Sequence, residues 1–323
     1  MKSMVCNLVC VLTAAIIAGG AGAQGYPAKP IKIVVPFPPG GASDITARIV
    51  GQKLSESWKL PVLIENRTGA NGIVGFESVA RSAPDGYTLI FSNVGSIAIN
   101  PSLYRKLPYD VERDFVPVIL ATSVPLVLVV NPALPVKSVK ELMAFAKEKG
   151  KQLNYASAGS GTSGHLATEL FKSMAGVEMH HVPYKGSAAG VTAVVANEVA
   201  LTFDTVLAAT AMIANGRVRA LAVCGAKRIQ ALPDLPTIAE AGLPGYEASS
   251  WGGILAPAGT PREIVDKLNG EIRRILYLPD VKQKIFELGG EVTGSTPDEF
   301  AAHIGAEIAK WAKVVKSSGA QVE

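Results

Sequence analysis

The chain has 323 residues, of which 48% are hydrophobic and 18% are charged. It is too apolar and too weakly charged to be disordered, and at roughly 150 residues per domain its length predicts about two domains. Its 31 Lys and Arg residues nearly balance its 27 Asp and Glu residues, which leaves a formal charge of +4. No run of basic residues occurs, so a nucleic-acid partner is not indicated.

The N-terminus has the features of an export signal. Lys2 precedes an apolar stretch at 8–18, and Ala21 and Ala23 form a small-x-small cleavage site before Gln24. The apolar stretch is shorter than the roughly 20 residues that a membrane-spanning helix needs. We therefore predict a signal peptide at 1–23 and a mature protein that is exported.

The cysteines predict neither a lipid anchor nor a disulfide. Cys6 and Cys10 come too early in the apolar stretch for lipid attachment. The mature chain keeps only Cys224, which cannot form an internal disulfide and which we expect to pack in a strand.

Short β-rich runs alternate with amphipathic stretches along the mature chain, which is typical of mainly parallel sheets flanked by helices. The predicted strands are 31–37, 61–66, 87–93, 116–120, 125–131, 153–158, 179–184, 199–204 and 219–225. The predicted helices are 43–58, 138–150, 163–176, 262–278, 280–288 and 297–316. Ser43 or Asp44 is suited to cap the first helix, and Gly150 to end the second. The pattern predicts an α/β fold.

Two segments, 108–136 and 222–236, have the composition of crossings between two α/β units. We therefore predict a discontinuous first domain, residues 24–123 plus 223–323, with residues 124–222 inserted as a second domain. Two connecting segments would restrict the domains to a hinge-like relative motion.

Two glycine-rich loops, 36–44 and 156–165, share one physical design. Each follows a strand, contains glycines and leads into a helix. Glycine lets the backbone approach a ligand closely, and free N–H groups at a helix start carry about half a positive charge. Such loops bind anions without a cationic side chain, so the pair predicts a site for a small acid.

An alternative interpretation concerns residues 159–164, which match G-x-G-x-x-G between a strand and a helix. This motif is typical of dinucleotide-dependent oxidoreductases. That function also needs an acidic residue near the end of the next strand, for the ribose hydroxyl. Here that strand ends at 183–185, and Glu178 lies before it.

The sequence gives little support to a catalytic nucleophile or a metal site. Neither Ser160 nor Ser163 has glycines at both −2 and +2, as a nucleophile elbow requires. His165, Glu169 and Lys172 share one helix face, which we interpret as solvated. His180 and His181 are neighbours on a strand and point to opposite sides, so they cannot easily share a metal ion.

Other strand ends could complete a pocket beside the two loops. Ser92 and Asn93 follow one predicted strand, and Tyr184 and Asp204 follow two others. Trp251 is suited either to line a cleft or to pack in the first domain, and the sequence pattern does not distinguish these two positions.

The sequence resembles the substrate-binding receptors of tripartite tricarboxylate transporters, also called Bug proteins. The resemblance is carried by segments that run over nearly the whole mature chain: YPAKPIKIVVPFPPGGASDITAR, IENRTGANG, SAPDGYTLIF, SAGSGTSGHLATELFK, HHVPYKGSAAG and AKRIQALPDLPTIAEAGLPGYEASSWGGILAPAGTP. It implies a two-lobed periplasmic-binding-protein fold (Venus flytrap, type 2), a periplasmic location, a membrane permease as partner and no enzymatic activity. We expect the protein to be a monomer without a cofactor. The sequence departs from the family at 197–198, where such receptors often read Gly-Gln.

The resemblance also implies that main-chain and hydroxyl groups of the two glycine loops hold the carboxylate of the ligand. Together with the strand ends, the expected ligand-binding residues are Phe37, Pro38, Gly40, Gly41, Ser43, Asp44, Ser92, Asn93, Ser157, Gly159, Ser160, Gly161, Thr162, Tyr184 and Asp204. The leading hypothesis is a receptor for a dicarboxylate, tricarboxylate, acidic amino acid or aromatic acid. The alternatives are the oxidoreductase and a sensory protein that presents its ligand to a signalling partner.

Overall fold

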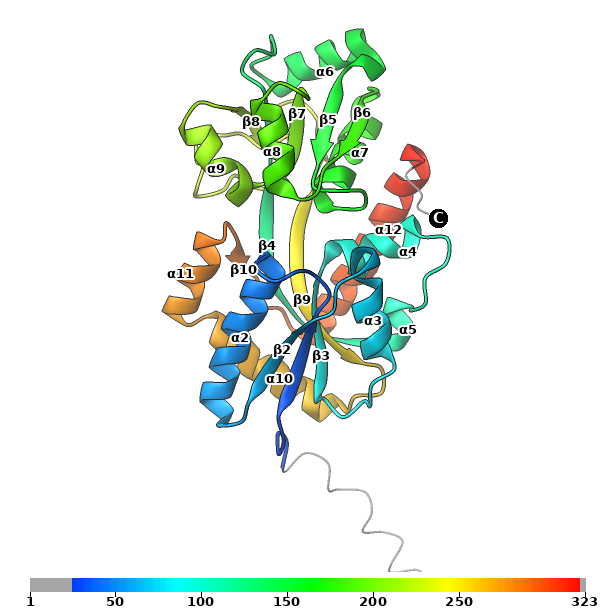
Figure 1. The fold of residues 1–323 in the computed structure, drawn as a ribbon, viewed down its shortest axis with the longest axis vertical. Helices are drawn as coiled ribbons and strands as arrows, with labels where there is room; N and C mark the ends of the chain where they lie inside the picture. The colour runs from blue at the N-terminus through cyan, green and yellow to red at the C-terminus, as the bar shows by residue number, and fades with distance from the viewer. Residues whose placement is uncertain (1–24, 320–323) are drawn as a thin grey trace, which may run out of the picture.

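The computed structural model describes residues 25–319, so the predicted signal peptide lies outside the described residues. The molecule has two lobes, one above the other in Figure 1, and the chain crosses between them on two strands. The first lobe comprises residues 25–123 and 251–319, and the second lobe comprises residues 124–250. The two-lobed α/β fold predicted from the sequence is confirmed.

The first lobe is built on three parallel strands. Before the first crossing it contains β1 (Ile31–Val35), α2 (Ala42–Trp58), β2 (Val62–Asn66), η2 (Ala70–Gly72), α3 (Ile73–Ala80), β3 (Thr88–Asn93), η3 (Gly95–Ile99), α4 (Asn100–Leu103) and α5 (Val111–Asp114). After the second crossing it adds α10 (Arg262–Leu276), α11 (Pro279–Glu287), β10 (Glu291–Val292) and α12 (Pro297–Ser318). β1 lies in the middle and pairs Ile33 with Ile64 of β2 and with Leu89 of β3. It is an apolar run because helices cover both of its faces.

The second lobe repeats the strand, loop and helix order. It contains α6 (Val139–Lys149), η4 (Gly150–Gln152), β5 (Asn154–Ser157), α7 (Ser163–Ala175), β6 (His180–Pro183), α8 (Ser187–Val195), β7 (Leu201–Thr205), α9 (Val206–Ala214) and β8 (Arg219–Val223). β5 pairs in parallel with β6 on one side and with β7 on the other. The loops that follow these three strands therefore meet at one edge of the lobe, facing the first lobe.

Two long antiparallel strands, β4 (Phe115–Val130) and β9 (Ser249–Pro257), join the lobes. Their pairing runs from Phe115 opposite Pro257 to Pro125 opposite Ser249. The whole sheet has the order β2-β1-β3-β9-β4-β7-β5-β6, so one hydrogen-bonded surface extends through both lobes. The two short strands predicted at 116–120 and 125–131 are one strand, and each lobe combines parallel outer strands with antiparallel pairs to β4 or β9.

The chain returns to the first lobe on β9, beyond the boundary predicted at 222–223. The segment between β8 and β9 stays on the second lobe because its backbone and side chains bond there. The Cys224 N–H donates to Leu126 O at 2.8 Å, and the Tyr246 hydroxyl donates to Ala167 O of α7 at 2.9 Å. Cys224 itself is fully buried just after β8.

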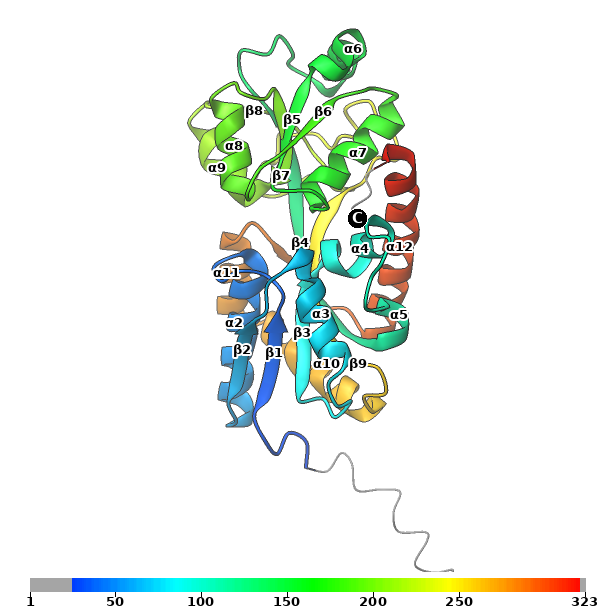
Figure 2. The same cartoon turned by 45° about the vertical axis from the view of Figure 1, so that its right-hand side comes forward.

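Helix α12 runs beside both lobes, as Figure 2 shows. It begins in the first lobe with a capping box between Thr296 and Glu299, and its last turns lie against α7 of the second lobe. Its buried Glu307 accepts hydrogen bonds at 2.9 Å from the indole N–H groups of both Trp251 and Trp311. This carboxylate therefore fastens α12 to the crossing strand β9.

Within residues 25–319, none of the helices combines the length and the apolar character that crossing a bilayer requires. The same part of the chain has no group of three or more His, Cys, Asp and Glu side chains placed to hold a metal ion.

We expect Glu307→Ala to lower the free energy of unfolding by about 2–4 kcal/mol, because two buried indole N–H groups lose their shared acceptor. Urea denaturation followed by tryptophan fluorescence measures this change. Glu307→Gln keeps an oxygen acceptor and should cost less, and Glu287→Ala at an exposed position of α11 should cost less than about 0.5 kcal/mol. Equal losses at 307 and 287 would show that the Glu307 carboxylate does not fasten α12 to β9.

Candidate functional site

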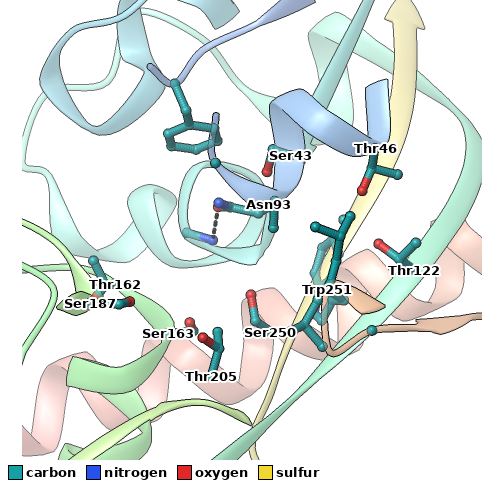
Figure 3. A pocket seen from close by; sticks show the side chains of 18 of the residues that line it. Ser43, Thr46, Asn93, Thr122, Thr162, Ser163, Ser187, Thr205, Ser250 and Trp251 are labelled. Atoms are coloured by element: carbon teal, nitrogen blue, oxygen red, sulfur yellow. Dashed lines mark hydrogen bonds between the residues drawn. The ribbon is translucent and has the colours of Figure 1, made fainter. Parts of the chain in front are cut away.

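A cavity of about 300 Å³ lies between the lobes, beside the crossing strands (Figure 3). The first lobe lines it with Phe37, Gly41, Ala42, Ser43, Thr46, Asn71, Phe91, Asn93, Gly95, Ile285, Leu288 and Gly290. The crossing strands add Thr122, Val124, Ser250, Trp251 and Gly252, and the second lobe adds Ala158, Thr162, Ser163, Gly164, Ser187, Asp204 and Thr205. Both glycine loops thus reach one hollow, as the shared design predicted.

Four helices begin at this cavity. The first turn of α2 contributes Gly41, Ala42 and Ser43, and α7, α8 and α9 of the second lobe begin beside Thr162, Ser187 and Thr205. Thr162 and Thr205 cap their own helices through their side chains. The starts of α2 and α8 carry no side-chain cap from any described residue, so their N–H groups are free to bind a ligand. Gly41, not Ser43 or Asp44 as predicted, is the N-cap of α2.

The cavity wall attracts anions without basic side chains. Neither Lys nor Arg is among the described residues that line it, and Asp204 is the only charged one. Each helix start contributes about half a positive charge, which acts strongly in a partly desolvated site. The hydroxyl groups of Ser43, Thr46, Ser163 and Ser250 surround the same space in Figure 3 and can donate further hydrogen bonds.

The first loop is held from behind by Asp44. Its Oδ2 accepts from the Gly40 N–H at 2.9 Å, and its Oδ1 accepts from the Asn66 side chain at 2.9 Å. Asn66 also donates to Phe37 O at 3.0 Å. Burial acts to raise the pKa of Asp44, but hydrogen bonds from Arg48, Gly40 and Asn66 outweigh it and leave the pKa below its usual value. Asp44 therefore remains ionised and shapes the loop without lining the cavity.

The second loop is held by two stacked imidazoles, His165 of α7 and His181 of β6, whose ring centroids are 4.0 Å apart. His165 Nδ1 accepts from the Gly161 N–H at 3.1 Å, and His181 Nε2 lies 2.6 Å from Ser157 Oγ. Burial is the main cause that lowers the pKa of His165 to about 4 and that of His181 to about 3. Both rings are therefore neutral at pH 7. His165 must be neutral because its Nδ1 accepts the hydrogen bond from the Gly161 N–H.

The prediction that His165, Glu169 and Lys172 form a solvated face is wrong. His165 and Glu169 are each only 5% exposed, although we expected their face of the helix to be solvated. Glu169 is buried because it accepts from the Tyr155 hydroxyl at 2.5 Å and from Lys172 at 2.8 Å. This polar network turns the face of α7 toward β5 and β6, which the helical periodicity alone could not show.

The lobes touch on both sides of the cavity. On one side, a Cβ atom at Gly161 would lie 2.5 Å from Leu103 Cδ2 of the first lobe. On the other, a Cβ atom at Gly289 would lie 3.0 Å from Leu207 Cβ of the second lobe. The structure is thus a closed arrangement in which these two glycines permit the approach of the lobes.

The structure divides the expected ligand-binding residues into two sets. Those that line the cavity are Phe37, Gly41, Ser43, Asn93, Thr162 and Asp204. Those that do not are Pro38, Gly40, Asp44, Ser92, Ser157, Gly159, Ser160, Gly161 and Tyr184. Most of the second set shape or support the loops, and Gly161 faces the other lobe instead of the cavity.

Side-chain alternation separates the two residues predicted at the end of β3. Phe91 and Asn93 line the cavity, so Ser92 between them points to the opposite face, where it is fully buried. Tyr184 likewise points away, with its hydroxyl 3.4 Å from Glu198 Oε2.

Sequence patterns did not predict most of the hydroxyl groups that line the cavity. Thr46 lies one turn into α2, and Ser187 and Thr205 lie at helix starts without a glycine motif. Ser250 lies on β9, which was not predicted because Gly252 and Gly253 weaken its strand pattern. Trp251, which the sequence left undecided, both lines the cavity and packs against Phe300 of α12.

The sequence profile described as the tripartite tricarboxylate transporter family receptor matches residues 46–320. The chain belongs to this receptor family. It is similar to protein BugT of Bordetella pertussis, with 38% identity over 95% of this chain and 94% of BugT.

Solved structures of family relatives superpose well. Rpa4515 of R. palustris with adipate is 42% identical, with a TM-score of 0.81 over 91% of this chain and 98% of that one. MatC of Rhodopseudomonas palustris with bound malate is 33% identical, with a TM-score of 0.78 over 90% of this chain and 100% of that one. At the position where the sequence departs from the family, Asn197 adopts φ 59°, a conformation that asparagine tolerates.

The comparisons do not favour the oxidoreductase alternative for residues 159–164, and the geometry explains two of its three glycines differently. Gly161 packs on Leu103 of the opposite lobe, where a Cβ atom would lie 2.5 Å from Leu103 Cδ2. Gly164 lets α7 approach β7, since a Cβ atom there would lie 2.1 Å from Phe203 O. The motif serves lobe closure and helix packing.

The histidine stack predicts a loss of stability in acid. Because the folded-state pKa of His165 lies below the value of about 6.5 in the unfolded chain, the unfolded chain binds more protons between these values. The stability that this pKa difference provides is fully present above pH 6.5 and is lost as the pH falls toward 4. For His165 this loss lowers the free energy of unfolding by about 3 kcal/mol. Urea denaturation at pH 7 and pH 4.5 measures it. His165→Asn should reduce the pH dependence, and the same substitution at exposed His180 should not; equal slopes in all three proteins would contradict the assignment.

The contact between the lobes predicts that Gly161→Ala hinders closure. The added methyl group would collide with Leu103, so small-angle scattering with a saturating acid should show a more open molecule than the native one. Gly216→Ala controls for backbone strain, because Gly216 also has a positive φ, of 64°, but has no atom within 4 Å of an added Cβ. The additional change Leu103→Ala should restore closure; a Gly161→Ala protein that closes like the native one would contradict this role.

Proposed function

We propose that this chain is a periplasmic solute-binding receptor that captures a small organic carboxylate between its lobes. The observation that carries the proposal is the cavity between the lobes at four helix starts, lined by hydroxyl groups and lacking basic side chains among the described residues. Neutral donors of this kind suit the carboxylate that many small acids share. The adipate and malate named for two solved relatives support this ligand class.

Delivery to a tripartite tricarboxylate-type permease follows from membership of the receptor family. The predicted signal peptide and a solved relative named periplasmic binding protein BugD, 33% identical, support a periplasmic location. We propose that the mature protein acts as a monomer, because one chain contributes both walls of the cavity. No feature of the cavity favours catalysis or presentation to a signalling partner instead.

A thermal-shift screen tests the ligand class. Protein that has been unfolded, freed of carried-over ligand and refolded is screened against mono-, di- and tricarboxylates, amino acids and aromatic acids. An acid present at about 100 times its dissociation constant should add roughly 2.7 kcal/mol of stability. Absence of a response to every acid would contradict the proposal.

Gly41→Val is the matched cavity variant for this screen. Gly41 lines the cavity with φ −79° and ψ 165°, which valine adopts freely, and an added Cβ would have only Pro38 O, at 3.9 Å, nearby. The side chain should occupy ligand space and abolish the shift without unfolding the protein. Gly25→Val, at an exposed glycine with no atom within 4 Å of an added Cβ, should leave the shift unchanged.

A further inference from the structure

Asp204 is the one acidic side chain among the described residues that line the cavity. It lies at the end of β7, directly before the start of α9, and only 4% of it is exposed. Its Oδ1 accepts from Ser187 Oγ and from the Thr205 N–H, both at 2.7 Å. Its Oδ2 is buried and has no hydrogen-bond partner among residues 25–319. A buried carboxyl group with one unpartnered oxygen is thus placed at the wall of the cavity in which we propose that an acid binds.

The charges of the cavity wall act on the charge of a bound acid. Four helix starts at the cavity supply positive potential, the end of α11 at Ile285 and Leu288 supplies negative potential, and an ionised Asp204 would offset part of the positive potential. No cationic side chain of the described lining adds to the positive potential. An ionised Asp204 in this wall therefore repels an acid with two negative charges more than an acid with one.

A proton on Asp204 would remove this repulsion. Burial raises the pKa of Asp204, against the lowering effect of the hydrogen bonds from Ser187 and Thr205. A second anion brought into the cavity acts in the same direction as burial, because like charges disfavour ionisation. Protonation would also relieve the cost of a buried, unpartnered carboxylate oxygen.

Resting on the proposed function, we propose that Asp204 sets the charge that the site accepts: a singly charged acid binds alone, whereas a doubly charged acid of the same length binds together with one proton. Asp204 is then a specificity residue that acts through its own protonation. Acids with a single carboxylate are favoured at high pH, and dicarboxylates gain as the pH falls.

Among residues 25–319, no other charged or titratable side chain is hydrogen-bonded to Asp204 or contributes to its pKa shift, and His165, which follows Gly164 on α7, accepts from the Gly161 N–H instead. Val127 of β4 is its partner in the sheet, and the α7, α8 and α9 starts present Gly164, Ser187 and Thr205. On β5, the neighbouring strand, Tyr155 and Ala156 pair with Leu201 and Thr202. Tyr155 is bonded to Glu169 on the far side of α7, and neither contributes to the shift at Asp204.

Hexanoate and adipate are matched probes, because they have equal chain length and differ in one carboxylate. Calorimetric titrations between pH 6 and pH 9, in buffers of different ionisation enthalpy, count the protons taken up. We expect about one proton for adipate in the alkaline part of this range and none for hexanoate, and up to tenfold weaker adipate binding per pH unit. Adipate that binds without proton uptake at every pH would overturn the proposal.

Asp204→Asn keeps an oxygen to accept from Ser187 and Thr205, so the fold should persist. At pH 8 this variant should bind adipate at least about tenfold more tightly than the native protein, without proton uptake and with hexanoate affinity nearly unchanged. Asp234→Asn makes the same charge change at an exposed position outside the cavity and should alter neither affinity. An unchanged ratio of the two affinities in Asp204→Asn would overturn the proposal.

The outcomes separate this inference from the proposed function. If acids bind but Asp204 and pH do not affect the choice between them, only the role of Asp204 fails. If neither probe nor any acid of the screen binds, the carboxylate receptor fails, and this inference fails with it. Should Asp204→Asn not fold, the proton count of the native protein with adipate decides alone.

Discussion

The antiparallel pair of β4 and β9 is the constraint on which the rest of the structure depends. Nine pairs of residues, from Phe115 and Pro257 to Pro125 and Ser249, hold the two strands together across the junction of the lobes. Each lobe adds its own strands to this pair, β3 on one side and β7 on the other. Any relative motion of the lobes must therefore bend these two strands. The same strands carry Thr122, Ser250 and Trp251 to the wall of the cavity.

The site separates the groups that face the ligand from the groups that hold them. Main-chain amides at helix starts and small hydroxyl side chains face the cavity, whereas Asp44, His165 and His181 tie the two glycine loops from behind. Helix dipoles supply positive potential without the flexibility and conformational entropy cost of Lys or Arg side chains. Anion binding then depends on loop geometry, which buried hydrogen bonds set.

Closure relies on close contact between small residues. Gly161 and Gly289 each lie against the opposite lobe, on either side of the cavity. Helix α12 adds a third connection, because it is fastened to β9 through Glu307 and reaches α7 at its far end. The cavity between these contacts is partly enclosed by both lobes, which strengthens the hydrogen bonds that a ligand makes there. The one acid in its described lining, Asp204, then acts in a low-dielectric setting.

The sequence by itself predicted most regular elements and the two glycine loops, because hydrophobic periodicity and helix-start chemistry are local properties. The helices predicted at 43–58, 138–150 and 163–176 all form with nearly those bounds. Tertiary structure alone decided the course of β9, the face of α7 and the choice between Ser92 and Asn93. β9 pairs on both sides despite its glycines, and α7 turns inward because Glu169 meets Tyr155 from another strand. These outcomes depend on partners distant in sequence, and local patterns carry no information about such partners.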